Sequence, residues 1–267
     1  MNSVDGHVTI GRRGQVHYTL TGATPPTRQP PLVFLHEGLG SVALWRSFPD
    51  DVCAAMKQRT TFVYSRHGYG RSSIVSEPRM PTYMHDEALD VLPQILRHFG
   101  LERPILIGHS DGASIALLHA GSGHDVAGLV LLAPHVFVED CSIAAIEKVR
   151  ESFATTDLSA KMARHHDDPS ATFRGWNDVW LSPEFRDWNI TSVAESITAP
   201  TLLIQGERDR FGTGAQLEAI ARSVQGRCET VLLPGVGHSP HLEAPDETLA
   251  AVVRFLDSLD TKPGRVD

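Results

Sequence analysis

A chain of 267 residues is long enough for one large domain or two small ones, and its 41% hydrophobic and 21% charged residues are ordinary for a globular protein with a sizeable core. The 24 basic and 32 acidic residues give a net charge of −8 without a basic cluster, so we expect no nucleic-acid partner. No apolar run approaches the ~18 residues that span a bilayer, and residues 1–14 lack a secretory-signal pattern. We therefore expect no membrane partner and a cytoplasmic location.

Short β-rich runs recur along most of the chain. The first predicted strand is 16–21, and it is followed by a Pro/Thr-rich loop. Continuous apolar runs then predict strands that are buried on both faces, as a parallel sheet requires. These runs are 32–35, 61–64, 104–108, 128–133, 201–205 and 229–233.

Helical patterns separate these strands. Apolar residues three or four apart predict a helix over 84–99 that ends at Gly100, and we interpret Pro93 inside it as a kink. A last helix has its apolar face over 249–259 and Asp246 as its predicted N-cap. The alternation predicts an α/β fold, with a mostly parallel central sheet and helices on both faces.

Residues 136–198 interrupt the alternation, because they contain helical patterns but no convincing buried strand. Three tryptophans fall in this segment: Trp176, Trp180 and Trp188. Roughly sixty residues are too many for an unstructured connection in a compact domain. We predict a helical cap over 136–198 above an α/β core that consists of residues 1–135 and 199–267.

The sharpest chemical signal is the GHSDG sequence at 108–112, a GxSxG pattern. An apolar strand precedes it and a helical pattern follows it, and a strand, a sharp turn and a helix together present the hydroxyl of Ser110 at the top of a sheet. The backbone N–H of Asp111 would then point at a developing oxyanion. The alternative is a glycine-rich turn that only packs a helix on a strand.

With this motif the chain resembles the α/β-hydrolase family over nearly its whole length. The LHEGLGS sequence at 35–41, followed by Trp45, is similar to the family's HGxxGS…W loop, which supplies the second oxyanion donor. The resemblance assigns that donor to the N–H of Gly38, with Leu39 as the near alternative. Glu37 stands where the family usually has glycine. A carboxylate would oppose the developing charge, so we expect Glu37 to point away or to bind part of the substrate.

The acid and the base follow from two later motifs. GERD at 206–209 is similar to the family's GxxD, and GVGH at 235–238 is similar to the start of its GxGH…ExP ending. Asp209 would hold the imidazole of His238 in one tautomer, and His238 would take the proton of Ser110. The three residues follow three separate strands in the chain order that this fold uses, so we predict a Ser110–Asp209–His238 triad.

Other residues near these motifs carry weaker predictions. His109, Trp176 and Trp180 are candidate substrate contacts, with packing as the alternative for each. The YSRHGYGRS sequence at 64–72 is similar to the family's DxxGxGxS turn, with Ser65 in place of the acid, and we assign it a structural role.

No metal site is predicted. Cys53, Cys141 and Cys228 are odd in number, far apart and without CxxC spacing, which argues against a disulfide framework or a zinc cluster. The HHDD sequence at 165–168 places potential ligands side by side, but adjacent side chains splay apart and no HExxH spacing is present. We expect no metal and no cofactor.

The predicted function is hydrolysis of a carboxylic ester (EC 3.1.1) in a small-molecule substrate, through an acyl-enzyme on Ser110. Relatives with aspartate at this position open epoxides or displace halide, and a serine argues against both reactions. Lactone, carbon–carbon and prolyl-peptide hydrolysis remain alternatives, although HEGLG differs from the HGGPG of prolyl peptidases and GHSDG from the GNSMG of carbon–carbon hydrolases. Lyases, cofactor-free oxygenases and ligand receptors also use this constellation. The oligomeric state is left open.

Overall fold

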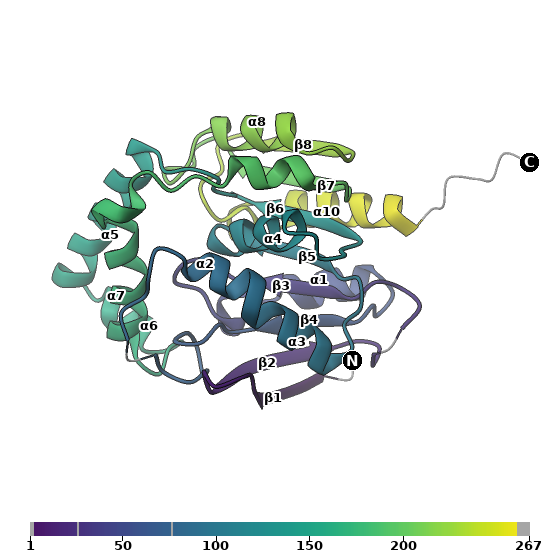
Figure 1. Ribbon diagram of the computed structural model, residues 1–267, viewed down its shortest axis with the longest axis horizontal. Helices are drawn as coiled ribbons and strands as arrows, with labels where there is room; N and C mark the ends of the chain where they lie inside the picture. The colour runs from purple at the N-terminus through teal and green to yellow at the C-terminus, as the bar shows by residue number, and fades with distance from the viewer. Residues whose placement is uncertain (1–2, 26, 76, 261–267) are drawn as a thin grey trace, which may run out of the picture.

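The computed structural model describes residues 3–25, 27–75 and 77–260. Eight strands form one sheet in the order β1-β2-β4-β3-β5-β6-β7-β8, in which β1 and β2 run antiparallel to their neighbours and the others are parallel (Figure 1). The strands are β1 Ser3–Thr9, β2 Gln15–Thr21, β3 Leu32–Leu35, β4 Thr61–Tyr64, β5 Ile105–His109, β6 Gly128–Leu132, β7 Thr201–Gly206 and β8 Cys228–Leu233.

The predicted strands lie within two residues of the observed ones, which confirms the α/β interpretation. The first strand, β1, was missed. Its sequence SVDGHVT contains Asp and Gly, and its side chains are exposed or half-buried, because it lies at the edge of the sheet and pairs only with β2. An exposed edge strand leaves no continuous apolar run to find.

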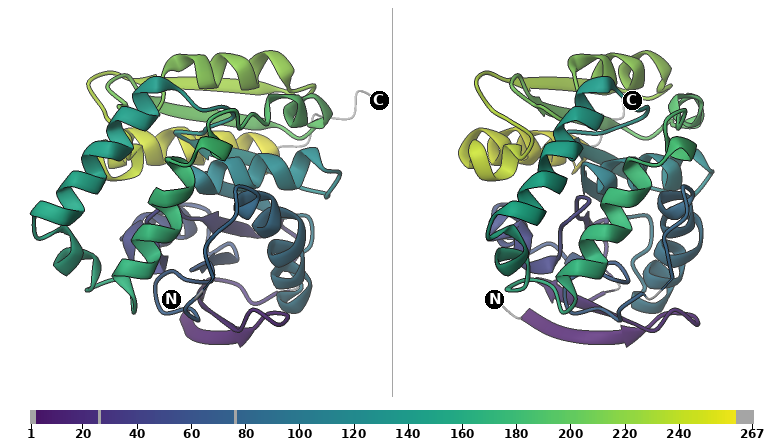
Figure 2. Two further views of the ribbon diagram at one scale, coloured as in Figure 1. Left: turned by 60° about the vertical axis from the view of Figure 1, so that its left-hand side comes forward. Right: turned by 90° about the vertical axis from the view of Figure 1, so that its left-hand side faces the viewer.

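Helices cover both faces of the sheet. On one face, α1 (Phe48–Ala55) and α10 (Pro245–Asp260) pack on the side chains of Leu32 and Phe34. On the other face, Val33 and Leu35 contribute to a second core with four helices (Figures 1 and 2). Those helices are α2 Tyr83–Asp86, α3 Leu92–Phe99, α4 Asp111–Gly121 and α8 Gly214–Ser223. The alternation along β3 explains its unbroken apolar sequence, since both of its faces are buried.

The structure adds detail to one prediction about the helices and contradicts another. A π-helical turn, η2 (Glu87–Val91), joins α2 to α3 immediately before Pro93, which is the second residue of α3. The wide turn accommodates the missing proline N–H, so the irregularity precedes Pro93. Helix α10 begins at Pro245, so Asp246 lies inside its first turn instead of capping it. Gly100 ends α3 in the left-handed conformation at φ 62°, as predicted.

The segment between β6 and β7 forms helices that lie across one end of the strands (Figure 1). They are α5 Asp140–Thr155, α6 Leu158–Met162, α7 Pro169–Trp180, η3 Pro183–Phe185 and η4 Thr191–Ser196. Phe153 stacks on Phe173 at a centroid distance of 3.9 Å, and Trp188 stacks on Phe185 at 5.1 Å. The helical content agrees with the expectation, whereas a separate cap domain bounded by residues 136 and 198 stays a prediction. No helix in the described ranges is long and apolar enough to cross a bilayer.

Candidate active site

Ser110 occupies a strained turn between β5 and α4. Its backbone angles are φ 52° and ψ −117°, a region that residues with a side chain rarely adopt. The glycines on either side permit this turn. A Cβ on Gly112 would lie 1.9 Å from the carbonyl oxygen of Leu35, and one on Gly108 would lie 2.3 Å from the carbonyl oxygen of Gly112. The close approach of α4 to β3 therefore requires glycine at 112.

His238 and Asp209 form a hydrogen-bonded pair beside Ser110, in the loops that follow β8 and β7. Nδ1 of His238 donates to the Asp209 carboxylate, 2.9 Å from each oxygen. The carboxylate also accepts from the backbone N–H of Phe211 at 2.8 Å. Burial opposes ionisation of Asp209, but the hydrogen bond and charge of His238 outweigh it and hold the pKa below its ordinary value. Because Nδ1 carries the proton in this bond, Nε2 of neutral His238 is left to act as a base.

The structure brings Ser110 and His238 to one cavity without joining them. Both residues line the cavity, and Ser110 is 7% exposed. The hydrogen bonds of the described residues include none between the Ser110 hydroxyl and His238. Such contacts often tighten only when a substrate is bound.

Two of the predicted oxyanion donors line the same cavity as Ser110, and the third follows Ser110 in the chain. Gly38 and Leu39 line the cavity, and Asp111 is the first residue of α4, where a backbone N–H has no partner within its helix. Within the described ranges, the N–H groups of Gly38, Leu39 and Asp111 donate no backbone hydrogen bond. An ideal Cβ on Gly38 would lie 2.1 Å from Nε1 of Trp176, so the indole packs directly on this loop.

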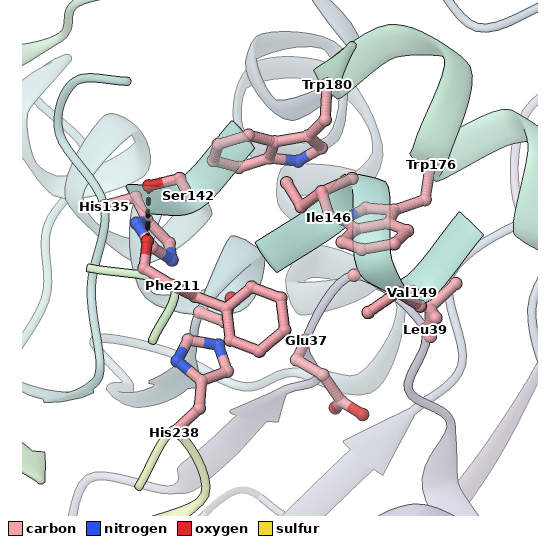
Figure 3. Close-up of a pocket in the computed structure, with 12 residues that line it drawn as sticks. Glu37, Leu39, His135, Ser142, Ile146, Val149, Trp176, Trp180, Phe211 and His238 are labelled. Carbon is pink, nitrogen blue, oxygen red and sulfur yellow. Dashed lines mark hydrogen bonds between the residues drawn. The ribbon is translucent and has the colours of Figure 1, made fainter. Parts of the chain in front are cut away.

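The carboxylate of Glu37 faces His109 more than the cavity centre. Oε2 lies 3.8 Å from Nδ1 of His109, and Figure 3 shows the carboxylate turned away from Trp176 and Trp180. Burial would raise the pKa of Glu37, but the His109 imidazole and the charge of His36 lower it to about 2. Glu37 thus borders the cavity as an ionised group whose carboxylate is directed at His109.

His109 lies behind the cavity instead of in it. It is 1% exposed, and its Nε2–H donates to the carbonyl oxygen of His238 at 2.8 Å. The residues that line the cavity do not include His109. The predicted substrate contact by His109 therefore has no support in this geometry, and the side chain holds the His238 loop instead.

The cavity has a volume of about 170 Å³ and two unlike walls (Figure 3). One wall, the floor, consists of residues from loops at the ends of strands: Glu37, Gly38, Leu39, Ser110, His135, Phe211 and His238. The other wall, the roof, comes from α5 and α7: Ser142, Ile146, Val149, Trp176 and Trp180. The structure thus brings the predicted contacts Trp176 and Trp180 to the same cavity as Ser110.

Comparison with known proteins identifies the family of this chain. The model of the alpha/beta hydrolase family matches residues 32–252, most of the chain. The chain belongs to the alpha/beta hydrolase family. The matched region of this chain contains every residue of the floor and of the roof of the cavity.

Named relatives differ in what they act on. The chain is 25% identical over 202 residues to the pimeloyl-acyl-carrier-protein methyl ester esterase of Xylella fastidiosa. The alignment covers 63% of this chain and 77% of that protein. The chain is 23% identical to a proline iminopeptidase of Lactobacillus helveticus over an alignment of 290 residues, 92% of this chain and 95% of that protein. The hydrolase names support an enzyme, and they do not agree on a substrate.

Solved structures share the fold at low identity. A bacterial membrane phospholipase A superposes with a TM-score of 0.75 at 19% identity, over 97% of this chain and 87% of that one. A malate-bound esterase of Thermogutta terrifontis superposes with a TM-score of 0.70 at 19% identity, over 97% of this chain and all of that one. At these identities the likeness concerns the fold alone.

A buried polar network that the sequence did not reveal connects the two walls. The Arg66 guanidinium lies 3.6 Å from the Asp111 carboxylate, and both side chains are almost fully buried. The Tyr83 hydroxyl donates to Asp111 at 2.6 Å and accepts from the indole N–H of Trp180 at 3.0 Å. Arg66 belongs to the 64–72 turn, whose family pattern gave no sign of a buried charge pair with the residue after the nucleophile.

The 165–168 segment uses its polar side chains within the fold. His166 accepts from the backbone N–H of Gly70 at 2.9 Å and donates to the carbonyl oxygen of Leu39 at 2.9 Å. Asp168 caps α7 by accepting from the N–H of Ala171. Within the ranges that the structure describes, no group of three His, Cys, Asp or Glu residues is arranged to hold a metal ion.

Proposed function

We propose that this protein is a serine hydrolase that cleaves a carboxylic ester in a small-molecule substrate. The observation that carries the proposal is the strained Ser110 turn, which opens into the same cavity as the hydrogen-bonded His238–Asp209 pair. A residue held at φ 52° requires a structural or functional reason. A nucleophile that must project from the top of a sheet is such a reason.

The proposed reaction proceeds through an acyl-enzyme. Ser110 Oγ attacks the acyl carbon while its proton passes to Nε2 of His238, and the charged imidazole is stabilised by Asp209. The backbone N–H groups of Asp111 and of Gly38 or Leu39 stabilise the oxyanion. The imidazolium then protonates the departing alcohol. A water molecule, deprotonated by His238, releases the acid and regenerates Ser110.

An ester is the substrate class that these groups favour. The cavity is small and mostly apolar, and the chain resembles a methyl ester esterase among other hydrolases. The same triad would serve lactone or carbon–carbon hydrolysis, and a non-hydrolytic member of the fold would retain the cavity without turnover. Turnover of simple esters separates these alternatives.

The test combines labelling with kinetics. We expect a fluorophosphonate probe to modify the wild type at Ser110, and short p-nitrophenyl esters to be hydrolysed. Ser110→Ala should abolish both, because it removes the attacking hydroxyl. Ser122→Ala is the matched control, since Ser122 is exposed just beyond the other end of α4. Retention of hydrolysis by Ser110→Ala would refute the proposed nucleophile, whereas binding of esters without labelling or turnover would favour a non-hydrolytic role.

A further inference from the structure

His135 places an imidazole in the floor of the cavity, although the sequence gave no sign of it. The residue follows β6 and is 2% exposed. Its ring lies edge-on to Trp180, at a centroid distance of 5.3 Å and an interplanar angle of 71°, and 5.7 Å from the ring of His238 (Figure 3). The carbonyl oxygen of His135 accepts from the Ser114 hydroxyl at 2.6 Å, so its backbone is fixed to α4. The ring is therefore held at a defined place beside the candidate base.

Among the residues that the structure describes, this imidazole has no hydrogen-bond partner. Nδ1 is buried without one, and the hydrogen bonds of the described residues include none at either ring nitrogen of His135. Burial, followed by the charge of His238, lowers the pKa of His135 to about 3, although Asp209 acts in the opposite direction. The ring is accordingly neutral and offers one N–H donor and one acceptor. Nδ1 is buried beside Gly212, so the unpaired Nε2 is the nitrogen on which a ligand in the cavity can form a hydrogen bond.

Neighbouring polar groups in the cavity wall are already engaged. The Ser142 hydroxyl donates to the carbonyl oxygen of Phe211, and the indole N–H of Trp180 donates to Tyr83. His135 differs from these neighbours. Its Nδ1 is buried on the side of Gly212, so Nε2, which forms no hydrogen bond among the described residues, is the ring atom that a bound molecule can reach.

The charge of the cavity limits what that molecule can be. Among the described residues that line it, Glu37 is the only acidic side chain and there is no Lys or Arg. A substrate carboxylate would find no cation in the wall and would be repelled by the ionised Glu37 at the border of the cavity. Apolar and aromatic side chains provide most of the remaining surface: Leu39, Ile146, Val149, Trp176, Trp180 and Phe211.

We propose that His135 is a specificity-determining residue that hydrogen-bonds a hydroxyl or carbonyl substituent of an uncharged, otherwise apolar ester. This inference rests on the proposed function and narrows its substrate class. The reacting ester group lies at Ser110 and the Gly38 loop, while the substituent pairs with His135 and the apolar remainder contacts Trp176, Trp180 and Phe211. A substrate without the substituent leaves the imidazole unpaired, and therefore reacts more slowly.

The test compares matched esters on three forms of the full-length chain: the wild type, His135→Phe and His135→Gln. The substrates are methyl phenylacetate, its analogues with a hydroxyl at the α carbon, the meta position or the para position, and its para-carboxylate. For at least one hydroxylated ester we expect the wild-type kcat/KM to exceed that of the parent by about ten-fold, and the carboxylate to react slowest. In His135→Phe, the ratio of kcat/KM for the hydroxylated ester to kcat/KM for the parent ester should fall close to one. In His135→Gln, this ratio should stay between that value and the wild-type ratio.

Two controls keep the outcome interpretable. His98→Phe makes the same change at an exposed position on α3 and should alter neither the melting temperature nor the preference. If His135→Phe lowers the melting temperature, the preference ratio is still measured below the transition. An unchanged ratio in folded His135→Phe, or a wild type without any preference, would overturn the inference. The proposed function would still stand if hydrolysis depends on Ser110.

A second measurement does not require turnover. Calorimetric titration of Ser110→Ala and of Ser110→Ala/His135→Phe with the same esters reports binding alone. We expect the second substitution to weaken binding of the favoured hydroxylated ester about ten-fold and to leave the parent ester unchanged. Equal affinities in the two variants, or no measurable binding by either, would overturn the role of His135.

Discussion

The floor and the roof of the cavity are built on different principles. The floor residues lie in loops that follow strands, where the paired register of the sheet fixes their positions. His238 of the floor is oriented by its hydrogen bond to Asp209, which lies outside the cavity lining. The roof side chains lie on α5 and α7, which pack largely through aromatic contacts such as Phe153 on Phe173. We therefore expect the floor to hold the reactive groups in place, and the roof, together with His135 and Phe211 of the floor, to select the molecules that approach them.

The largest predicted effect concerns Asp209, which orients His238 of the floor. It tests whether the loss of this residue lowers kcat equally for every ester. Asp209→Asn should lower kcat by about 10⁴-fold, because an amide can donate to Nδ1 of His238 and favour the tautomer that cannot accept the proton of Ser110. The fall should be equal for all esters, so that their ranking is unchanged. Steady-state kinetics on the ester series measures both quantities.

The control for this substitution is Asp246→Asn, an equivalent change in the first turn of α10, away from the cavity. It should leave kcat within about two-fold of the wild type, since most surface substitutions act weakly. A kcat for Asp209→Asn within ten-fold of the wild type would show that Asp209 does not orient the base. A change in the ranking of the esters by kcat would show that the floor also contributes to the choice of substrate through Asp209.

A second prediction concerns the connection between the two walls. Arg66→Met leaves the Asp111 carboxylate buried without its counter-charge, and should lower the free energy of unfolding by about 3–5 kcal/mol. Asp111 contacts Tyr83, which in turn bonds Trp180 of the roof. We expect urea unfolding followed by circular dichroism and by tryptophan fluorescence to shift together, because three of the four tryptophans lie between β6 and β7.

The double variant Arg66→Met/Asp111→Leu provides the comparison for this pair. Removing both charges should restore part of the lost stability, since an apolar pair avoids the unpaired carboxylate. Arg66 also donates to the carbonyl oxygen of Glu37 at 2.8 Å, so full recovery is not expected. Wild-type stability in the single variant would contradict the importance of the pair. Separate fluorescence and dichroism transitions would mean that the roof unfolds as an independent unit.

The sequence predicted the floor better than the roof, for physical reasons. Ser110, Asp209 and His238 follow apolar strands in short glycine-containing motifs, and the sheet brings such strand ends together regardless of the rest of the chain. The structure places all three together. Their catalytic roles stay predictions that the labelling and kinetic experiments test.

His135 and the Arg66–Asp111 pair could not be found in this way. Histidine at 135 is one of 14 in the chain, and only the three-dimensional packing shows that its ring nitrogens lack partners. Arg66 and Asp111 are 45 positions apart in different motifs, and no periodic pattern relates them. Buried polar contacts between distant segments depend on the packing of the whole fold, whereas strands depend on local composition.

The smallest predicted effect concerns Glu37, at the boundary between floor and roof. Its pKa of about 2 in the folded protein lies below the ordinary value of 4.5, so folding favours the ionised form. The resulting stabilisation is present above about pH 5 and is lost as pH falls from 4.5 towards 2. Glu37→Gln should therefore be less stable than the wild type by about 1–2 kcal/mol at neutral pH, discounted for its partial exposure. This difference should shrink at pH 3, as urea unfolding at both pH values would show.

The same variant tests whether the Glu37 carboxylate points away from the oxyanion site or acts on the bound substrate. Because the carboxylate is directed at His109 and away from Trp176 and Trp180, Glu37→Gln should change kcat by less than about ten-fold. A rise in kcat beyond that would mean that the carboxylate opposes the oxyanion during the reaction. A stability difference that stays constant between pH 7 and pH 3 would mean that His109 does not hold the charge. Either result would contradict the interpretation that the Glu37 carboxylate is held by His109 and does not act on the substrate.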